Sequence, residues 1–178
     1  MTRNPYFDIL FEPVKIGPVT TTNRFYQVPH CSGMGYKMPN SLAGMRGMKA
    51  EGGWGVVNTE YCSIHPSSDD TPYPHGSLWD DEDIAPNALM VEKVHEHGAL
   101  AGIQLWYGGA SAANLYTREA PLGAESGRAV YLDPVQSQIA NKSDIKEIRR
   151  WHVTAARRAK TAGFDIIYIY AAHDFLIQ

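Results

Sequence analysis

The sequence predicts an α/β protein, the N-terminal half of a (β/α)8 barrel with about four strand–helix units. Four short β-rich segments recur along the 178 residues, and stretches with helical apolar spacing separate them. A long loop follows the third segment, on the side where βα loops of a barrel build active sites. Strands that alternate with helices pair in parallel through right-handed crossovers, which gives this class of fold.

The four expected strands are residues 24–29 (RFYQVP), 55–60 (GVVNTE), 100–105 (LAGIQL) and 165–170 (DIIYIY). Each one begins after a turn or a glycine and ends in polar or small residues. In the fourth, side chains alternate between the two faces of the sheet. Tyr168 and Tyr170 are therefore expected on one face, and Ile167 and Ile169 on the other.

Helices are expected between successive strands. The first is short and ends at Gly52-Gly53, the second spans 84–97, and the third is capped by Ser143 and ends at Gly163. Their apolar positions are Leu42, Met45 and Met48 in the first helix, Ile84, Ala88, Met90, Val91 and Val94 in the second, and Ile145, Ile148, Ala155, Ala159 and Ala162 in the third.

The loop over residues 108–141 is rich in Gly, Ala, Ser and Asn. A doubly wound open sheet would also fit the alternation, but it usually carries a glycine-rich phosphate turn after its first strand. Residues 30–35 (HCSGMG) have two glycines in a G-x-G arrangement and no third one three residues later. They fail the dinucleotide fingerprint, so the barrel is preferred.

Chain length limits how much of a barrel can form. A complete (β/α)8 barrel takes about 250 residues, so we expect residues 1–178 to form a partial barrel domain, with its remainder and any further domains absent. Half a barrel has two unpaired sheet edges beside apolar side chains. We therefore expect the chain to associate with a second copy as a homo-oligomer, or to be one part of a longer protein.

Composition excludes several classes. The formal net charge of −3 offers no field for a phosphate backbone, so nucleic acid is not expected as a partner. Two cysteines are too few for a disulfide scaffold or a four-thiolate metal site, and no metal site is expected. No apolar run is long enough to span a membrane, and the start has no secretory signal. A cytoplasmic protein is predicted.

Four stretches carry a resemblance to a known family: ILFEPVKIGPVTTTNRFYQVPHCSGMG, KAEGGWGVVNTEYCSIHPSSDD, HGALAGIQLWYGG and AGFDIIYIYAAH. They resemble the N-terminal part of the trimethylamine, dimethylamine and histamine dehydrogenases, within the Old Yellow Enzyme group of flavin barrels. The resemblance runs from about Asp8 to His173 and is weakest between Ala120 and Asn141. It implies an FMN at the mouth of the barrel and makes residues 1–178 part of an FMN-binding domain.

The resemblance also assigns residues to the cofactor. Cys31, in VPHC, matches the cysteine that these dehydrogenases bond covalently to carbon 6 of the flavin; without the resemblance, an inert thiol would be the better interpretation. Val28, Pro29 and His30 match the segment that lies against the flavin. Gln104 matches a flavin-contacting Gln of the ene reductases, where trimethylamine dehydrogenase has Glu; an amide can both donate to and accept from the pyrimidine edge.

Three further residues match the substrate side. Tyr61 matches one wall of the aromatic bowl that holds trimethylamine, where relatives that act on secondary amines carry Gln. Ring faces attract an ammonium group by about 0.5–2 kcal/mol each, so Tyr61 favours a trimethylated substrate. Tyr170 and His173, in Y-A-A-H, match a hydrogen-bonded pair that tunes substrate protonation and are the expected catalytic residues.

The function implied is FMN-dependent oxidation of trimethylamine or a related amine, a C–N oxidoreductase reaction that gives dimethylamine and formaldehyde. The fragment alone is expected to be inactive. A 4Fe-4S cluster is expected only in the missing C-terminal part, and an electron-transferring flavoprotein is the expected partner of the complete enzyme. Two alternatives stay open: an NAD(P)H-dependent ene reductase, against which Tyr170 argues, and a non-catalytic half-barrel.

Overall fold

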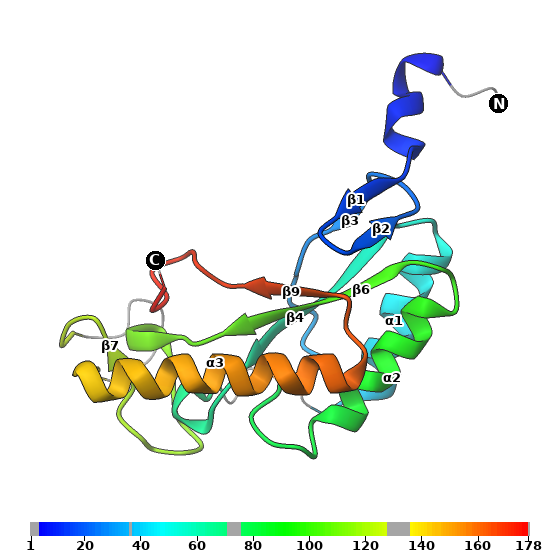
Figure 1. The fold of residues 1–178 in the computed structure, drawn as a ribbon. Coiled ribbons are helices and arrows are strands. Elements are labelled where there is room, and N and C mark those ends of the chain that lie inside the picture. Colours follow the sequence, from blue (N-terminus) through cyan, green and yellow to red (C-terminus); the bar gives the residue numbers. More distant parts are fainter. Residues whose placement is uncertain (1–3, 36, 71–75, 128–135, 178) are drawn as a thin grey trace.

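The computed structural model describes residues 4–35, 37–70, 76–127 and 136–177 (Figure 1). Three α-helices form: α1 (Pro39–Glu51), α2 (Ile84–His95) and α3 (Lys142–Ala162). The strands are β1 (Val14–Ile16), β2 (Val19–Thr21), β3 (Tyr26–Gln27), β4 (Val56–Ser63), β5 (Gly76–Ser77), β6 (Leu100–Trp106), β7 (Leu122–Gly123), β8 (Gln138–Ile139) and β9 (Ile166–Ile169). Short 3-10 helices are η1 (Pro5–Phe11), η2 (Pro66–Ser68) and η3 (Gly109–Ser111).

The central sheet follows the order β3-β4-β6-β9, and all of its pairs are parallel. The short strand β5 joins the carboxyl end of β4 on the β3 side. In Figure 1, β4, β6 and β9 run in the same direction, toward the end of the molecule where β7 and the C-terminus lie. This sequential order confirms the predicted α/β class and matches the first four strands of an open (β/α)8 barrel.

Two of the expected strands differ from their predicted bounds by more than one residue at an end. The first is only two residues long, and β4 runs three residues further than expected, so that Tyr61 lies inside the strand rather than after it. Asn58 pairs with Gly102 and Tyr61 pairs with Gln104, so β4 uses three residues where β6 uses two. The extra residue restores Tyr61 to the face that Asn58 also occupies.

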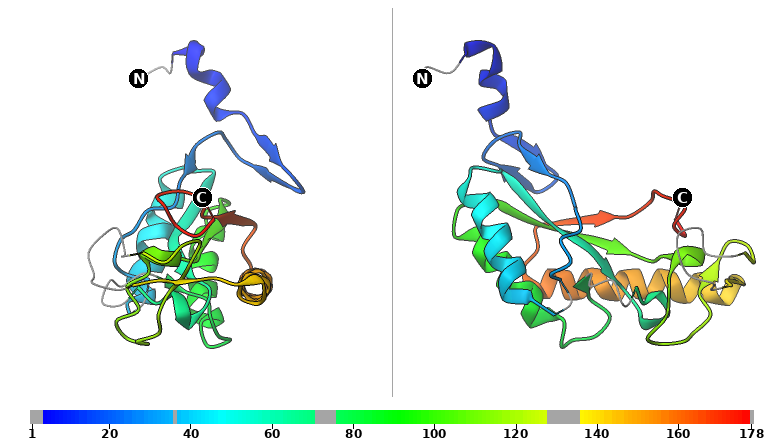
Figure 2. Two further views of the ribbon diagram at one scale, coloured as in Figure 1. Left: turned by 90° about the vertical axis from the view of Figure 1, so that its left-hand side faces the viewer. Right: turned by 180° about the vertical axis from the view of Figure 1, so that it is seen from behind.

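The hydrophobic core lies between the sheet and the three helices, which cover one face of it (Figure 2). Parallel strands need this cover, because both faces of such a strand exclude water. The fully buried members from the strands are Val57, Cys62, Ala101, Ile103 and Leu105, and those from the helices include Ala43, Ala50, Met90, Val91, Val94, Ile148, Ala155 and Ala159. The opposite face of the sheet is the interior of the partial barrel.

Helix ends and faces correct the sequence analysis at several points. Helix α3 is capped by Asn141 in a capping box with Asp144, not by Ser143, and it ends at Gly163 in the left-handed conformation, as expected. In α1, the expected core residue Met48 is 64% exposed, and Arg46 is buried in its place. Ile145 of α3 is also exposed.

The N-terminal residues form an antiparallel hairpin, β1–β2, that the sequence analysis missed. Gly17 adopts a positive φ of 57° at its turn. The 3-10 helix η1 precedes the hairpin and projects away from the body (Figure 1), and Tyr6 at its start is 82% exposed. Of the predicted long loop, residues 128–135 lie outside the described part, and the rest contains η3 and the short β7–β8 pair.

In the described ranges, no helix combines the length and the apolar character needed to cross a bilayer. The same ranges bring no three His, Cys, Asp or Glu side chains together in a group that could hold a metal ion.

Candidate functional site at the carboxyl edge of the sheet

The structure brings the predicted site residues together at one edge of the parallel sheet. Val28, Pro29, His30 and Cys31 follow β3, whereas Tyr61 and Gln104 pair directly across β4 and β6. Tyr170 and His173 follow β9. Tyr61 and Gln104 share a face, and Tyr168 has the same register as Gln104. Carboxyl ends of parallel strands form the mouth of a barrel, so these residues lie together at that mouth.

Aromatic side chains form a continuous cluster at this mouth. The Tyr61 ring centroid lies 4.7 Å from that of Trp106 and 5.9 Å from that of Tyr170. Phe175 closes the group, with its ring 5.0 Å from Tyr170 and 5.3 Å from Trp106. Trp106 and Phe175 were not among the predicted site residues, although Trp106 is two residues after Gln104 and therefore shares its face.

Tyr170 and His173 form the pair that the sequence predicted. The Tyr170 hydroxyl lies 2.8 Å from His173 Nδ1. His173 and the next residue, Asp174, both have positive φ, 59° and 57°. Residues with a Cβ seldom adopt this left-handed backbone conformation. Here it turns the chain so that the imidazole of His173 returns to Tyr170. The two residues can therefore share a proton at the mouth.

Tyr61 has a carboxylate partner that the sequence analysis did not select. Its hydroxyl donates a hydrogen bond to the Asp70 carboxylate. Burial and the nearby charge of Asp70 raise the pKa of Tyr61 above its ordinary value, so the phenol stays neutral. The neighbouring Asp69 is fully buried and accepts hydrogen bonds from the backbone N–H groups of Tyr116 and Thr117, at 2.8 and 3.1 Å. The loop that carries Asp70 is thereby tied to the loop after β6.

The residues that follow Cys31 wrap around the side chain of Glu60. This carboxylate accepts hydrogen bonds from Ser32 N at 2.7 Å, Ser32 Oγ at 3.2 Å and Gly33 N at 3.1 Å, and from Gly35 N. A Cβ at Gly35 would lie 2.2 Å from Glu60 Oε1. Glycine is therefore required where the backbone approaches the carboxylate.

The residue before Cys31 is held by a second buried charge. Arg46 of α1 is fully buried, and its Nη2 donates to the His30 carbonyl oxygen at 2.7 Å, while Nη1 lies 2.9 Å from His30 Nδ1. Arg46 also donates to the Gln27 side chain at 3.2 Å. Partial burial and the charge of Arg46 lower the pKa of His30, so its imidazole can accept from the guanidinium.

Cys31 itself has an exposed side chain between these two anchors. Partial burial of the sulfur atom and the charge of Glu60 raise the pKa of the thiol to about 11. The thiol is therefore protonated at neutral pH. Cys62, by contrast, is fully buried in the core behind the sheet.

The donor set at the mouth suits a flavin. Gln104 is 6% exposed, and within the described residues its side-chain amide has no hydrogen-bond partner, which leaves a donor and an acceptor directed into the barrel. Val28 is 61% exposed at the end of β3 and offers an apolar surface to a ring face. An accessible thiol, an unpaired amide and an apolar side chain at one edge are compatible with an isoalloxazine.

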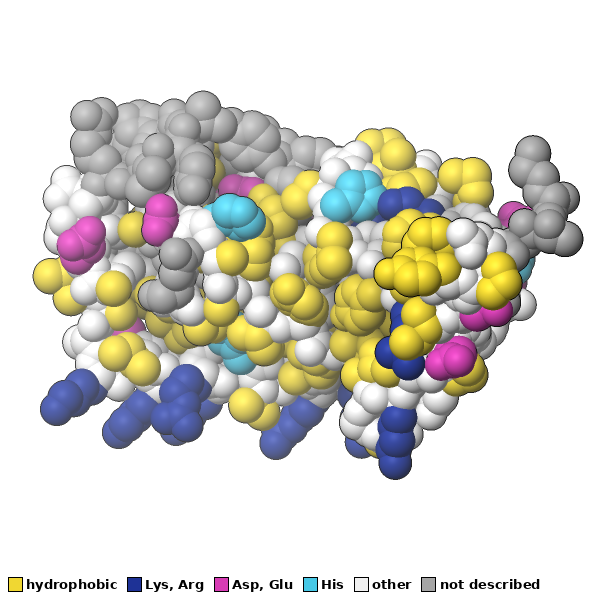
Figure 3. Space-filling model, turned by 90° about the horizontal axis from the view of Figure 1, so that it is seen from above, with side chains coloured by type: hydrophobic (Ala, Val, Ile, Leu, Met, Phe, Trp, Pro, Cys, Tyr) yellow, Lys and Arg dark blue, Asp and Glu magenta, His cyan; other side chains and the backbone are white. Residues whose placement is uncertain are grey.

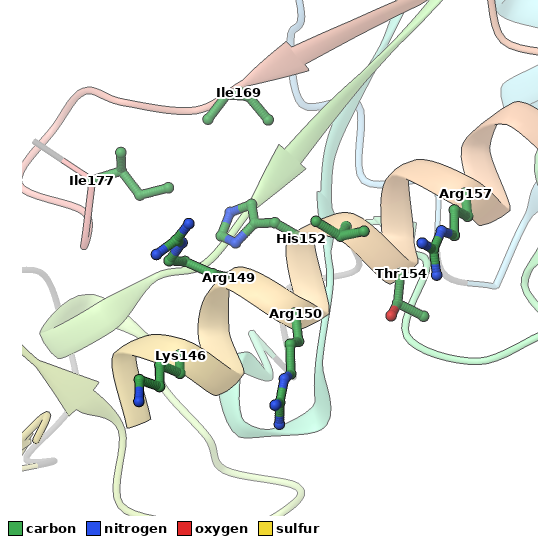
Figure 4. A pocket seen from close by; sticks show the side chains of 9 residues that line it. Lys146, Arg149, Arg150, His152, Thr154, Arg157, Ile169 and Ile177 are labelled. Carbon is green, nitrogen blue, oxygen red and sulfur yellow. The ribbon is translucent and has the colours of Figure 1, made fainter. Parts of the chain in front are cut away.

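A hollow on the other side of β9 is unrelated to this edge (Figure 4). Lys146, Arg149 and His152 of α3 border it, together with Ile169 and Ile177. Ile169 lies at the register of Leu105 and faces the helices rather than the barrel interior. Figure 3 shows Lys and Arg side chains in a row along the edge of the molecule where α3 lies. None of the predicted site residues lines this hollow.

Comparison with known proteins identifies relatives over the whole chain. The dimethylamine dehydrogenase of Hyphomicrobium sp. (strain x) is 42% identical over 181 residues, covering 98% of this chain and 25% of the relative. Histamine dehydrogenase from Rhizobium sp. 4-9 matches with a TM-score of 0.94 and 51% identity, over 98% of this chain and 27% of that one. The 6-hydroxypseudooxynicotine amine oxidase from Pseudomonas geniculata N1 matches with a TM-score of 0.95 and 47% identity, over 99% of this chain and 26% of that one.

The chain therefore spans about a quarter of the length of these relatives. A family model also matches residues 9–178. Because this match includes every residue of the candidate site, the resemblance seen in the sequence is confirmed, and the chain belongs to the NADH:flavin oxidoreductase / NADH oxidase family.

Proposed function

We propose that these residues form the cofactor and substrate face of an FMN-dependent enzyme that oxidises small amines. The observation that carries the proposal is the placement of an exposed thiol, Cys31, and an aromatic cluster around Tyr61 at the same edge of one parallel sheet. Similarity to a dimethylamine dehydrogenase and a histamine dehydrogenase supports the choice of amines.

In this proposal, Cys31 holds the flavin covalently, Gln104 binds its pyrimidine edge, and residues 28–30 lie against its ring. When bound, FMN accepts the two electrons that leave the carbon next to the amine nitrogen. The chain's own residues bind the amine, exclude water and control its proton. Electron transfer onward to an iron–sulfur cluster and an electron-transferring flavoprotein stays a prediction for the complete protein.

The aromatic cluster is proposed to bind the substrate as an ammonium ion. Tyr61, Trp106, Tyr170 and Phe175 offer ring faces within one group, and each face attracts a cation by about 0.5–2 kcal/mol. A trimethylated nitrogen has a single N–H to donate, so ring faces are the natural means to select it. Trimethylamine is therefore the first substrate to test.

Tyr170 and His173 are proposed as the catalytic pair. An amine can release electrons from an adjacent C–H bond only when its lone pair is free, so the ammonium proton must first leave. The imidazole of His173, whose Nδ1 lies 2.8 Å from the Tyr170 hydroxyl, is placed to hold that proton.

Replacing Cys31 tests the cofactor assignment. In the complete protein that carries these residues, Cys31→Ala should leave no flavin attached after denaturation, whereas the matched control Cys62→Ala should keep it. Absorbance of acid-precipitated protein measures the attachment. Flavin that survives precipitation in Cys31→Ala would contradict the assignment.

Replacing Tyr61 tests the substrate. Tyr61→Gln should lower the ratio of kcat/KM for trimethylamine to that for dimethylamine several-fold, because one ring face contributes about 1 kcal/mol. Tyr116→Gln serves as the control, since Tyr116 is 71% exposed in another loop. An unchanged ratio in Tyr61→Gln would remove the argument for a trimethylated substrate.

We also propose that residues 1–178 form a partial FMN-binding domain that does not hold FMN tightly alone. A barrel of this kind grips the flavin phosphate with loops after its seventh and eighth strands. Titration of FMN into the 178-residue chain, followed by flavin fluorescence, should give no saturable binding at micromolar concentration. Tight binding with turnover of trimethylamine would contradict this part of the proposal.

A further inference from the structure

The side chain of Glu60 accepts hydrogen bonds from the loop that follows Cys31. Three backbone N–H groups and one hydroxyl, all from residues 32–35, point at its carboxylate. The side chain is 0% exposed, although it comes from the middle of a central strand. The backbone that follows Cys31 is therefore shaped around one buried negative charge.

Among the described residues, no Lys or Arg forms an ion pair with Glu60. A buried carboxylate without an ion-pair partner depends on hydrogen bonds to offset the loss of water, and removing them is costly. Arg46, which holds His30 on the other side of Cys31, acts on Glu60 only as a nearby charge. The hydrogen bonds from residues 32–35 therefore both hold this carboxylate and fix the backbone next to Cys31.

The charge acts on the adjacent thiol. Burial is the first cause that raises the pKa of Cys31 to about 11, and the charge of Glu60 is the second. Asp70 also raises it, whereas a hydrogen bond from the Tyr61 backbone and the charge of Arg46 lower it. An ordinary cysteine has a pKa of about 8.5. Cys31 is exposed, yet it carries very little thiolate at neutral pH.

We propose that Glu60 is a positioning residue for Cys31: its carboxylate fixes the loop that carries the thiol, and its charge keeps that exposed thiol unreactive toward electrophiles from solution. The proposal rests on the proposed function in one respect, that Cys31 is the flavin attachment point. An attachment cysteine must stay unmodified until the cofactor is in place. A guarded thiol meets that need, because only an electrophile held at the site has time to react with it.

The test measures the reactivity of Cys31 in the 178-residue chain without flavin. Iodoacetamide alkylates the wild type, Glu60→Gln and Glu60→Asp between pH 7 and 11, and mass spectrometry follows the Cys31 and Cys62 peptides separately. Asp83→Asn is the matched control, because Asp83 also accepts from a hydroxyl and backbone N–H groups, those of Ser77, Trp79 and Asp80. Cys62 reports folding, since it is 1% exposed and reacts only in unfolded chains.

For the wild type, alkylation of Cys31 should rise steeply with pH toward a midpoint near 11. Glu60→Gln keeps the size of the side chain and removes the charge, so alkylation at pH 8 should be at least about fivefold faster, as each unit of pKa is tenfold in thiolate. Glu60→Asp keeps the charge and should stay within about twofold of the wild type. Asp83→Asn should leave the Cys31 rate unchanged.

Three results would overturn the proposal. The first is an unchanged rate in Glu60→Gln, and the second is an equal acceleration in Asp83→Asn, which would indicate general loosening. The third is a midpoint for alkylation of wild-type Cys31 near the ordinary pKa of a cysteine. This result would overturn the proposal even if Glu60→Gln fails to fold and exposes Cys62. Since no flavin is present, these outcomes are independent of whether the complete protein binds FMN or oxidises amines.

Discussion

Strands β6 and β9 are neighbours in one parallel sheet, yet water reaches them very differently. Ile103 of β6 is fully buried, whereas Ile167 of β9, at the same register, is 40% exposed. Likewise, Leu105 is fully buried and Ile169 is 46% exposed. Among the described residues, β6 has a paired strand on each side, and β9 is paired on one side only. The aliphatic side chains of β9 are thus less enclosed than those at the same register in β6.

This difference divides the candidate site. Gln104 and Trp106 come from the enclosed strand, whereas Tyr170 and His173 follow the exposed one. The proposed flavin contact Gln104 therefore lies on the strand with more packed neighbours, and the proposed catalytic pair follows the strand with fewer. Substitutions on the two strands should reveal this contrast.

The largest expected effect comes from truncating the matched isoleucines. Ile103→Ala should reduce the free energy of unfolding by about 2–5 kcal/mol, because it opens a cavity in a closed core. Ile167→Ala should cost less than about 1 kcal/mol, because water already reaches that side chain. Urea unfolding of the two variants measures the contrast. Equal losses would mean that β9 is enclosed in solution, for example by a second copy.

A smaller effect is expected from crowding the inner face of β6. A Cβ at Gly102 would lie 2.0 Å from Asn58 Oδ1, so Gly102→Ala should cost about 1–3 kcal/mol. Gly44→Ala, in α1, is the control, because a Cβ there meets no atom within 4 Å and alanine favours a helix. If both alanines are tolerated equally in urea unfolding, the inner face of β6 is not tightly packed.

The smallest expected effect is a pH dependence on the β9 side. Burial lowers the pKa of His152, which lies under β9 in α3, below the ordinary value of about 6.5. Below pH 6.5 the unfolded chain therefore binds a proton at His152 that the folded chain does not. The contribution of His152 to the free energy of unfolding is complete above this pH and falls as the pH drops toward the pKa of the folded state.

The loss contributed by His152 should not exceed about 1.4 kcal/mol per pH unit. Urea midpoints at pH 7.5 and 5.5 measure it, with His152→Gln as the comparison, in which the dependence should be weaker. An unchanged dependence in His152→Gln would assign the effect to another group, of which His65 is the first candidate because burial also lowers its pKa.

Local patterns predicted the helices, the parallel strand order and the edge where the site forms. They placed Tyr170 and His173 at the barrel mouth, whereas the hydrogen bond between the two, which the structure shows at 2.8 Å, was implied by the family resemblance. The family resemblance, and not the spacing, selected Cys31, Gln104 and Tyr61.

The rest depended on contacts that a local pattern does not contain. Glu60 contacts residues more than twenty positions earlier, so nothing near it in the sequence indicates its role. Arg46 broke the apolar pattern of α1, which led the prediction to place Met48 in the core. Tyr61 was placed after the second strand, because an extra residue inside β4 hid the continuation of the strand.

That extra residue determines which face each of two consecutive side chains occupies. Glu60 and Tyr61 are consecutive, yet one faces the Cys31 loop and the other the aromatic cluster. Without the irregularity, strict alternation would bring Glu60 into register with Gln104 and turn Tyr61 toward the helices. Under the proposed function, a substitution at Tyr61 therefore changes the amine that the site accepts, while the neighbouring carboxylate keeps its contacts with residues 32–35.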